Sequence, residues 1–202
     1  MITEYTLISS SNGTYTEKGS SFTALSFPAN SLLDIKSILI SLKEQFIDAS
    51  HICYAYRIKH EGNIDEFAAD AGEPKGCSGI PILNVLKSKK LVDAAIFVVR
   101  YFGGKKLGIP GLIHAYGQAA ENSITDERIK PWIKLCVLSF IYPYKVQKKV
   151  ETIIQQYNLE VKDNKYAESI EISMEVKESM QKEIITKLNE ITKGNIKINI
   201  ST

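Results

Sequence analysis

The sequence predicts an α+β protein of two domains, with α/β alternation of strands and helices in the first. Up to residue 128, apolar strand patterns alternate with amphipathic helix patterns around two glycine-rich loops. Residues 132–202 follow the order strand, helix, strand, strand, helix, strand, which is typical of a ferredoxin-like βαββαβ domain. The composition changes between the two parts, because the chain after Pro131 contains no arginine and a single glycine. We therefore expect domains at 1–128 and 132–202.

Bulk composition narrows the class of protein. The chain has 202 residues, 44% of them apolar, and a net charge of +2, which are values typical of a soluble globular protein. No apolar run approaches the length of a membrane span, and the N-terminal residues lack the pattern of a signal peptide. The three cysteines form no CxxC pair and are odd in number, which favours reduced thiols. These features predict a cytoplasmic monomer without membrane contact, in which nucleic-acid binding would depend on local basic patches.

The first elements follow from alternation and helical spacing. Alternating apolar residues near the N-terminus predict a strand pair joined through the Ser-Asn-Gly sequence at 11–13. Ser31 and Asp34 form a capping-box pattern, and the apolar spacing after them predicts an amphipathic helix at 32–47. Residues 51–59 alternate again and predict a strand.

Three further elements surround the glycine-rich loops. Pro81 suits a first helical position, and the residues after it predict a short buried helix that ends in several lysines. The nearly continuous apolar run at 94–102 predicts a central strand. A second helix is expected from Pro110 to Asp126.

The C-terminal part is read from the same patterns. We expect strands at 134–142, 159–163, 167–177 and 196–200, and helices at 144–157 and 178–192. A turn is expected at 163–165, between the second and third of these strands, and Gly194 is suited to follow the last helix.

The two glycine-dense loops are the most distinctive feature of the chain. They lie within ADAGEPKGCSGIP at 69–81 and FVVRYFGGKKLGIPGLIHAYG at 97–117. Each precedes a helix, so its backbone N–H groups and the helix dipole suit an anion. The candidate anion- or nucleic-acid-binding residues are Arg100, Gly103, Gly104, Lys105, Lys106, Gly108 and Gly111. The alternative is a structural reversal with close helix–sheet packing and solvated lysines.

A second set of candidates suits a ligand or a partner protein, namely His51, Asp70, Gly72, Glu73 and Tyr101. The two carboxylates can accept hydrogen bonds from a partner. Alternatively, Glu73 pairs with Arg100 or satisfies amides of the neighbouring loop.

Metal binding and nucleophilic catalysis are disfavoured. The residues that would imitate a zinc site, His51, Cys53, Cys77 and His114, lack the paired local spacing of such sites. A catalytic His–Cys pair needs a thiol in an electropositive setting, which the sequence does not indicate. We therefore expect no metal, no cofactor and no catalytic residue.

Both loops resemble the IMPACT family, whose bacterial members are the YigZ-type proteins. The matching stretches are ASHICYAY at 49–56, DAGEPKGCSGIP at 70–81 and VRYFGGKKLGIPGLIHAY at 99–116. The resemblance implies an N-terminal domain with a mixed sheet, similar to the second domain of a small-subunit ribosomal protein. It also implies a C-terminal domain similar to the last domain of elongation factor G. The chain departs from the family pattern at Ala71, Cys77, Ser78, Pro110 and His114.

Three functions remain open. The favoured one is a translation-associated regulatory protein that contacts RNA, the ribosome or a translation factor through the two loops. The resemblance implies this link, because eukaryotic members of the family restrain a stress kinase of translation initiation by binding its activator. The second is a protein-interaction regulator of translation initiation or stress signalling without RNA contact. The third is an enzyme acting on a phosphorylated or nucleotide-like ligand, for which no nucleophile with its base is apparent.

Overall fold

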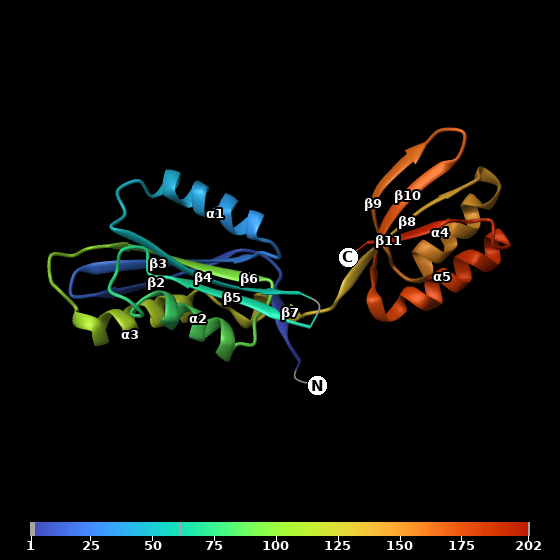
Figure 1. Ribbon diagram of the computed structural model, residues 1–202. Helices are drawn as coiled ribbons and strands as arrows, with labels where there is room; N and C mark the ends of the chain where they lie inside the picture. The colour runs from blue at the N-terminus through green and yellow to red at the C-terminus, as the bar shows by residue number, and fades with distance from the viewer. Residues whose placement is uncertain (1–2, 61, 202) are drawn as a thin grey trace. The chain divides into compact units, whose positions relative to one another are not determined.

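The computed structural model describes residues 3–60 and 62–201, and it divides into two compact units, Met1–Trp132 and Ile133–Thr202 (Figure 1). Each unit has hydrophobic clusters of its own. The structure is therefore the α+β architecture that the sequence predicts.

A five-stranded sheet organises the N-terminal unit. Its strands are β2 (Ser11–Glu17), β3 (Ser20–Pro28), β4 (His51–Lys59), β5 (Ile64–Ala69) and β6 (Ala94–Tyr101), in the order β2-β3-β6-β4-β5. The predicted central strand is confirmed, because β6 lies in the middle of the sheet and is buried along most of its length. The expectation of a mixed sheet is corrected, because β6 runs opposite to both of its neighbours and the other two pairings are also antiparallel.

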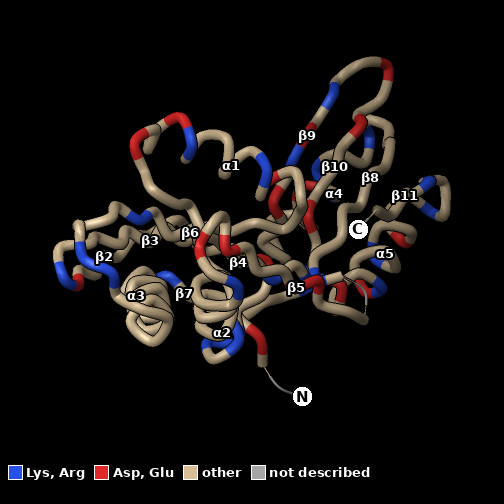
Figure 2. Tube along the Cα trace, turned by 60° about the vertical axis from the view of Figure 1, so that its left-hand side comes forward, with Lys and Arg blue, Asp and Glu red and all other residues tan. Residues whose placement is uncertain are grey.

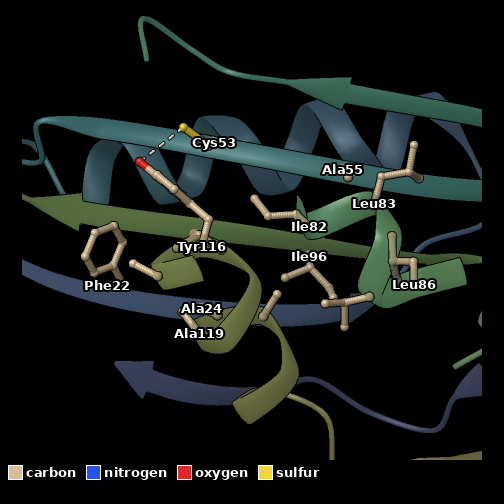
Figure 3. Close-up of a cluster of buried hydrophobic side chains, with 14 of the residues drawn as sticks. Phe22, Ala24, Cys53, Ala55, Ile82, Leu83, Leu86, Ile96, Tyr116 and Ala119 are labelled. Atoms are coloured by element: carbon tan, nitrogen blue, oxygen red, sulfur yellow. Dashed lines mark hydrogen bonds between the residues drawn. The ribbon is translucent and has the colours of Figure 1, made fainter. Parts of the chain in front are cut away.

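Helices cover the two faces of this sheet unequally (Figure 1). The helix α1 (Leu32–Gln45) lies on one face, and α2 (Gly79–Ser88) and α3 (Gly108–Asn122) lie on the other. Alternation within each strand sends neighbouring side chains to opposite faces. In β4, for example, Cys53 and Ala55 join the cluster beneath α2 and α3, whereas Tyr56 and Ile58 join the cluster beneath α1. Figure 3 shows the first of these clusters.

The capping box predicted at the start of α1 is confirmed. The Ser31 hydroxyl accepts a hydrogen bond from the Asp34 backbone N–H at 3.2 Å, and the Asp34 carboxylate accepts one from the Ser31 N–H at 3.1 Å. These bonds satisfy backbone donors that the first turn of a helix leaves without intrahelical partners.

The Ser-Asn-Gly sequence at 11–13 is not the predicted turn. These residues lie inside β2, and the chain reverses at Lys18 and Gly19, which have φ values of +48° and +84°. Gly13 is needed for close approach instead, because an added Cβ would lie 2.2 Å from the carbonyl carbon of Asn122 in α3. The Ser-Asn-Gly sequence is typical of a turn, but here its glycine allows α3 to pack closely against the strand.

Other boundaries in this unit also differ from the expectation. The strand β5 was not predicted, and α2 begins at Gly79, which places Pro81 at the third helical position. The helix α3 begins and ends earlier than expected, and a 3₁₀ turn at Asp126–Arg128 follows it. Beyond that turn, β7 (Ile129–Pro131) pairs with β1 (Tyr5–Leu7) in an antiparallel ribbon.

The C-terminal unit has the predicted βαββαβ order. Its elements are β8 (Leu135–Tyr142), a 3₁₀ turn (Tyr144–Val146), α4 (Gln147–Gln156), β9 (Glu160–Tyr166), β10 (Ile170–Lys177), α5 (Glu178–Thr192) and β11 (Ile198–Ser201). The strands form an antiparallel sheet in the order β11-β8-β10-β9, as in ferredoxin-like domains. One face of this sheet packs with α4 and α5 around Leu138, Met174 and Leu188.

Two local predictions in this unit have different outcomes. The turn expected at 163–165 is wrong, because β9 continues to Tyr166 and the chain reverses between Ala167 and Ser169. Polar residues are favoured on this exposed edge strand, where they discourage pairing with other chains. Gly194 follows the end of α5 as predicted, with φ +75° and its N–H donating to the Asn189 carbonyl at 2.9 Å.

Candidate functional site

Strand direction brings the two glycine-rich loops to one end of the N-terminal sheet (Figure 1). The strands β5 and β6 both run antiparallel to β4, so both finish where β4 begins. The β2–β3 turn lies at the same end, because β3 is antiparallel to β6. We call this region, formed by the turn at 18–19, residues 70–78 and 102–107, and the start of β4, the loop end.

The Asp70 carboxylate binds hydrogen-bond donors of its own loop. Its carboxylate accepts hydrogen bonds from the backbone N–H groups of Gly76, Ser78 and Gly79 at 2.8–3.2 Å, and from the Ser78 hydroxyl at 2.7 Å. Burial opposes its ionisation, but the bonds from Gly76, Gly79 and Ser78 outweigh burial and hold the pKa of Asp70 below its ordinary value. The N-terminus of α2 is therefore already occupied by an anion of the same chain.

Glu73 joins the first loop to the second. Its side chain is 4% exposed, and its Oε1 accepts hydrogen bonds from the Tyr116 hydroxyl at 2.8 Å and from the Arg100 guanidinium. The pairing with Arg100 is one of the roles that the sequence leaves open for Glu73. Because Tyr116 lies in α3, one carboxylate connects the first loop, the end of β6 and the helix that follows the second loop.

The buried Arg100 side chain contacts two aromatic rings in addition to Glu73. Its guanidinium carbon lies 5.4 Å from the ring centroid of Phe22 and 5.7 Å from that of Phe102. Its Nε has no hydrogen-bond partner among the described residues, and the two cation–π contacts add to the stabilisation that Glu73 gives the group. Arg100 therefore acts within the chain, and its side chain is 7% exposed.

His51 lies at the edge of this network. Its Nδ1 is 3.0 Å from the Ala71 carbonyl and therefore carries the hydrogen, while Nε2 lies 3.9 Å from Glu73 Oε1. Gly72 has φ +93°, and an added Cβ there would lie 3.2 Å from the imidazole. The glycine thus allows the loop to pack against the ring.

The thiol nearest to these groups is not activated. Cys53 Sγ donates to the Asp70 carbonyl at 2.9 Å. It also lies 3.4 Å from the Tyr116 hydroxyl, the contact that Figure 3 shows as a dashed line. Burial is the main reason that the pKa of Cys53 rises to about 11, and burial likewise raises the pKa of Tyr116. The nucleophilic thiolate is therefore a minor form of Cys53 near neutral pH.

The second loop packs tightly where it leaves β6 and then opens to solvent. An added Cβ at Gly103 would lie 1.9 Å from the carbonyl carbon of Gly19, and the Gly103 N–H donates to the Ser20 hydroxyl at 3.0 Å. The next residues, Gly104, Lys105 and Lys106, are exposed. Figure 2 shows basic positions in this part of the chain.

The N-terminus of α3 is open where that of α2 is capped. Leu107 at its N-cap makes no side-chain hydrogen bond, and the first turn contains no acidic residue. Within the described residues, the backbone N–H groups of Gly108 and Ile109 have no acceptor. The start of α3 and the lysines before it are exposed, so the positive end of the helix dipole lies at a solvent-accessible segment.

Two of the remaining candidate residues, Tyr101 and Gly111, lie outside the hydrogen-bond network of Asp70 and Glu73. Tyr101 neighbours Arg100 in β6 and so points to the opposite face of the sheet. Gly111 lies against Leu107, because an added Cβ would be 2.9 Å from the Leu107 Cβ. Sequence reasoning considered Cys53 only as a metal ligand or catalytic thiol. It did not predict the hydrogen bonds of Cys53 with Asp70 and Tyr116, or that of Tyr116 with Glu73.

No group of three or more potential metal ligands occurs among the residues that the structure describes. His114, one of the four residues considered as possible zinc ligands, packs edge-on against Tyr15 with ring centroids 5.5 Å apart. Over the same residues, each helix is too short or too polar to cross a bilayer.

Comparison with known proteins identifies the class of protein that carries this loop end. Residues 18–124 match the Impact N-terminal domain, and residues 141–195 match a domain of unknown function, DUF1949. The chain belongs to the IMPACT family, which confirms the resemblance noted in the two loops.

Individual relatives match both units. The IMPACT family member YvyE of Bacillus subtilis is 31% identical over 161 residues, covering 80% of this chain and 74% of the relative. An IMPACT family member in the pol 5′ region of Thermus thermophilus is 32% identical over 155 residues, covering 77% and 83%. A crystal structure described as that of a hypothetical protein covers 98% of this chain and 97% of its own, with 21% identity and a TM-score of 0.72, which supports the fold.

Proposed function

We propose that this IMPACT-family protein is a translation-associated binding protein that takes phosphate groups of RNA at the loop end. The observation that carries the proposal is the open N-terminus of α3 beside two exposed lysines, Lys105 and Lys106. Donors and positive charge at a helix start form a common anion-binding arrangement in proteins.

The contrast between the two loops favours α3 over α2 as the contact. Asp70 already neutralises the start of α2, so an external anion there would meet a carboxylate. Pro110 removes one donor from the first turn of α3, which leaves the N–H groups of Gly108 and Ile109 and the lysine side chains. With so few contacts, we expect weak binding that falls steeply with salt.

The connection to translation is what the resemblance to the family implies, because its eukaryotic members restrain a stress kinase of translation initiation by binding its activator. Two alternatives have less support in the geometry. A partner protein that needs the carboxylates of Asp70 or Glu73 would have to break their internal hydrogen bonds. An enzyme that uses Cys53 would have to ionise a buried thiol.

The test is the salt dependence of binding to a fluorescein-labelled RNA stem-loop, measured by fluorescence anisotropy. The double variant Lys105→Glu/Lys106→Glu should bind at least about 10-fold more weakly than wild type at low salt, because it reverses two charges beside the phosphate site. In Lys105→Ala/Lys106→Ala, the slope of log affinity against log salt should decrease in magnitude by about 1 to 2. The reason is that binding releases fewer counterions when fewer phosphate contacts form.

The matched control is Lys36→Glu/Lys43→Glu, which makes the same charge change on exposed positions of α1 on the other face of the sheet. This variant should bind nearly as well as wild type. Equal affinity of wild type and the Lys105/Lys106 variants, or equal losses in both pairs, would contradict an RNA site at the loop end.

A further inference from the structure

Phe102 is an exposed aromatic residue of the loop end. It follows β6 directly and is 51% exposed, although the neighbouring side chains of that strand are mostly buried. Its backbone is fixed, because its N–H donates to the Ser50 hydroxyl at 3.1 Å. A half-exposed ring leaves one part of its apolar surface available to a ligand.

The Phe102 ring contacts a buried ion pair. The Arg100 guanidinium contacts the ring of Phe102 at 5.7 Å, and Glu73 in the first loop binds that guanidinium. Both charged groups are almost fully buried, so little freedom remains in the support. Arg100 and Glu73 are therefore positioning residues for the aromatic surface, and the two loops act together through them.

Charge and donors surround the exposed side of the second loop. Lys105 and Lys106 follow Phe102 by three and four residues, and the open start of α3 comes next. A stacking ring beside cations and free N–H groups is the combination that binds the bases and the backbone of a single strand. In a duplex the bases are stacked on one another, so the ring would have no partner there.

We propose that the loop end selects single-stranded RNA, with one unpaired base stacked on Phe102 and the adjoining phosphates on the lysines and the start of α3. This inference rests on the proposed function and adds the class of RNA and the residue that selects it. The base stacks on the ring face away from Arg100, whose charge strengthens the stack.

The test compares two labelled RNA probes by fluorescence anisotropy with the full chain. One is a single strand of roughly 12 adenosines, and the other is a duplex of roughly 12 base pairs. Wild type should bind the single strand more tightly than the duplex. Phe102→Ala should weaken single-strand binding by about 5- to 150-fold and leave duplex binding nearly unchanged, whereas Phe102→Trp should retain single-strand binding.

Phe67→Ala is the matched control, because Phe67 is a similarly exposed phenylalanine, 45% exposed, on the edge strand β5. It should bind both probes as wild type does, and thermal melting should show that each variant is folded. Equal loss in Phe67→Ala and Phe102→Ala would overturn the inference, as would wild-type preference for the duplex.

The same experiment separates this inference from the proposed function. If wild type binds both probes equally and Phe102→Ala changes neither affinity, the selection of single strands is wrong while a phosphate site remains. If wild type binds neither probe, the proposed function and the inference are both wrong.

Discussion

Two carboxylates three residues apart, Asp70 and Glu73, have separate roles in the first glycine-rich loop. Asp70 accepts four hydrogen bonds from the loop that starts α2, and Glu73 joins Arg100 to Tyr116. Hydrogen bonds to an ionised acceptor are stronger than those to a neutral one. The fold near the site therefore depends on the charge of Asp70.

Replacement of Asp70 by Asn should lower the free energy of unfolding by about 2–4 kcal/mol near neutral pH, because the amide leaves buried N–H donors unsatisfied. The folded-state pKa of Asp70 is lower than its unfolded value. Its stabilisation is thus fully present above a pH of about 4 and is lost as the pH falls through the folded-state pKa. The difference between wild type and variant should therefore narrow in acid.

Urea unfolding of both proteins near pH 7 and near pH 3 measures this difference. Asp48→Asn, at an exposed position beyond the end of α1, is the control and should have little effect at either pH. A difference between wild type and Asp70→Asn that stays constant with pH would contradict the assigned role.

At the scale of elements, neighbouring glycines in the second loop have different reasons to be glycine. Gly103 lies where the loop crosses the β2–β3 turn, so that any side chain would overlap the backbone of Gly19. Gly104 has φ +83° with open space around it, so its requirement is conformational. Gly103 allows two backbone segments to approach closely, whereas Gly104 is needed only for the conformation of the loop.

Gly103→Ala should therefore destabilise the protein by about 3 kcal/mol or more, because two backbone segments must separate. Gly104→Ala should cost about 1 kcal/mol, which is the strain of an alanine in the left-handed region. Thermal denaturation followed by circular dichroism compares the two variants. An equal effect at both positions would mean that the contact with Gly19 does not limit the packing.

At the scale of the whole molecule, the hydrophobic clusters assign a separate core to each unit. The N-terminal clusters lie on the two faces of the five-stranded sheet, and the C-terminal cluster lies between its own sheet and helices. A domain with its own core can unfold independently. We therefore expect two unfolding transitions.

Leu138→Ala removes a fully buried side chain from the C-terminal core and should lower the stability of that unit by about 3 kcal/mol. Leu86→Ala makes the same change in a fully buried position of the N-terminal core. In differential scanning calorimetry, each variant should shift one transition and leave the other in place. A joint shift of both transitions in either variant would show that the units unfold together.

The sequence determined the features that depend on neighbours along the chain. The capping box of Ser31 and Asp34 and the βαββαβ order follow from local pattern, because hydrogen bonding within a turn and the period of apolar residues are local properties. The glycine-rich motifs also identified the family.

Only the tertiary structure decided which groups in those loops are already bound. The close packing of α3 on β2 requires a glycine at position 13. The start of α2 is capped because Asp70 folds back on its own loop, whereas α3 receives no such acceptor. Phe102 stays exposed while Arg100 behind it is buried. A donor or a ring is available to a ligand only if no distant segment occupies it, and local sequence does not record that occupancy.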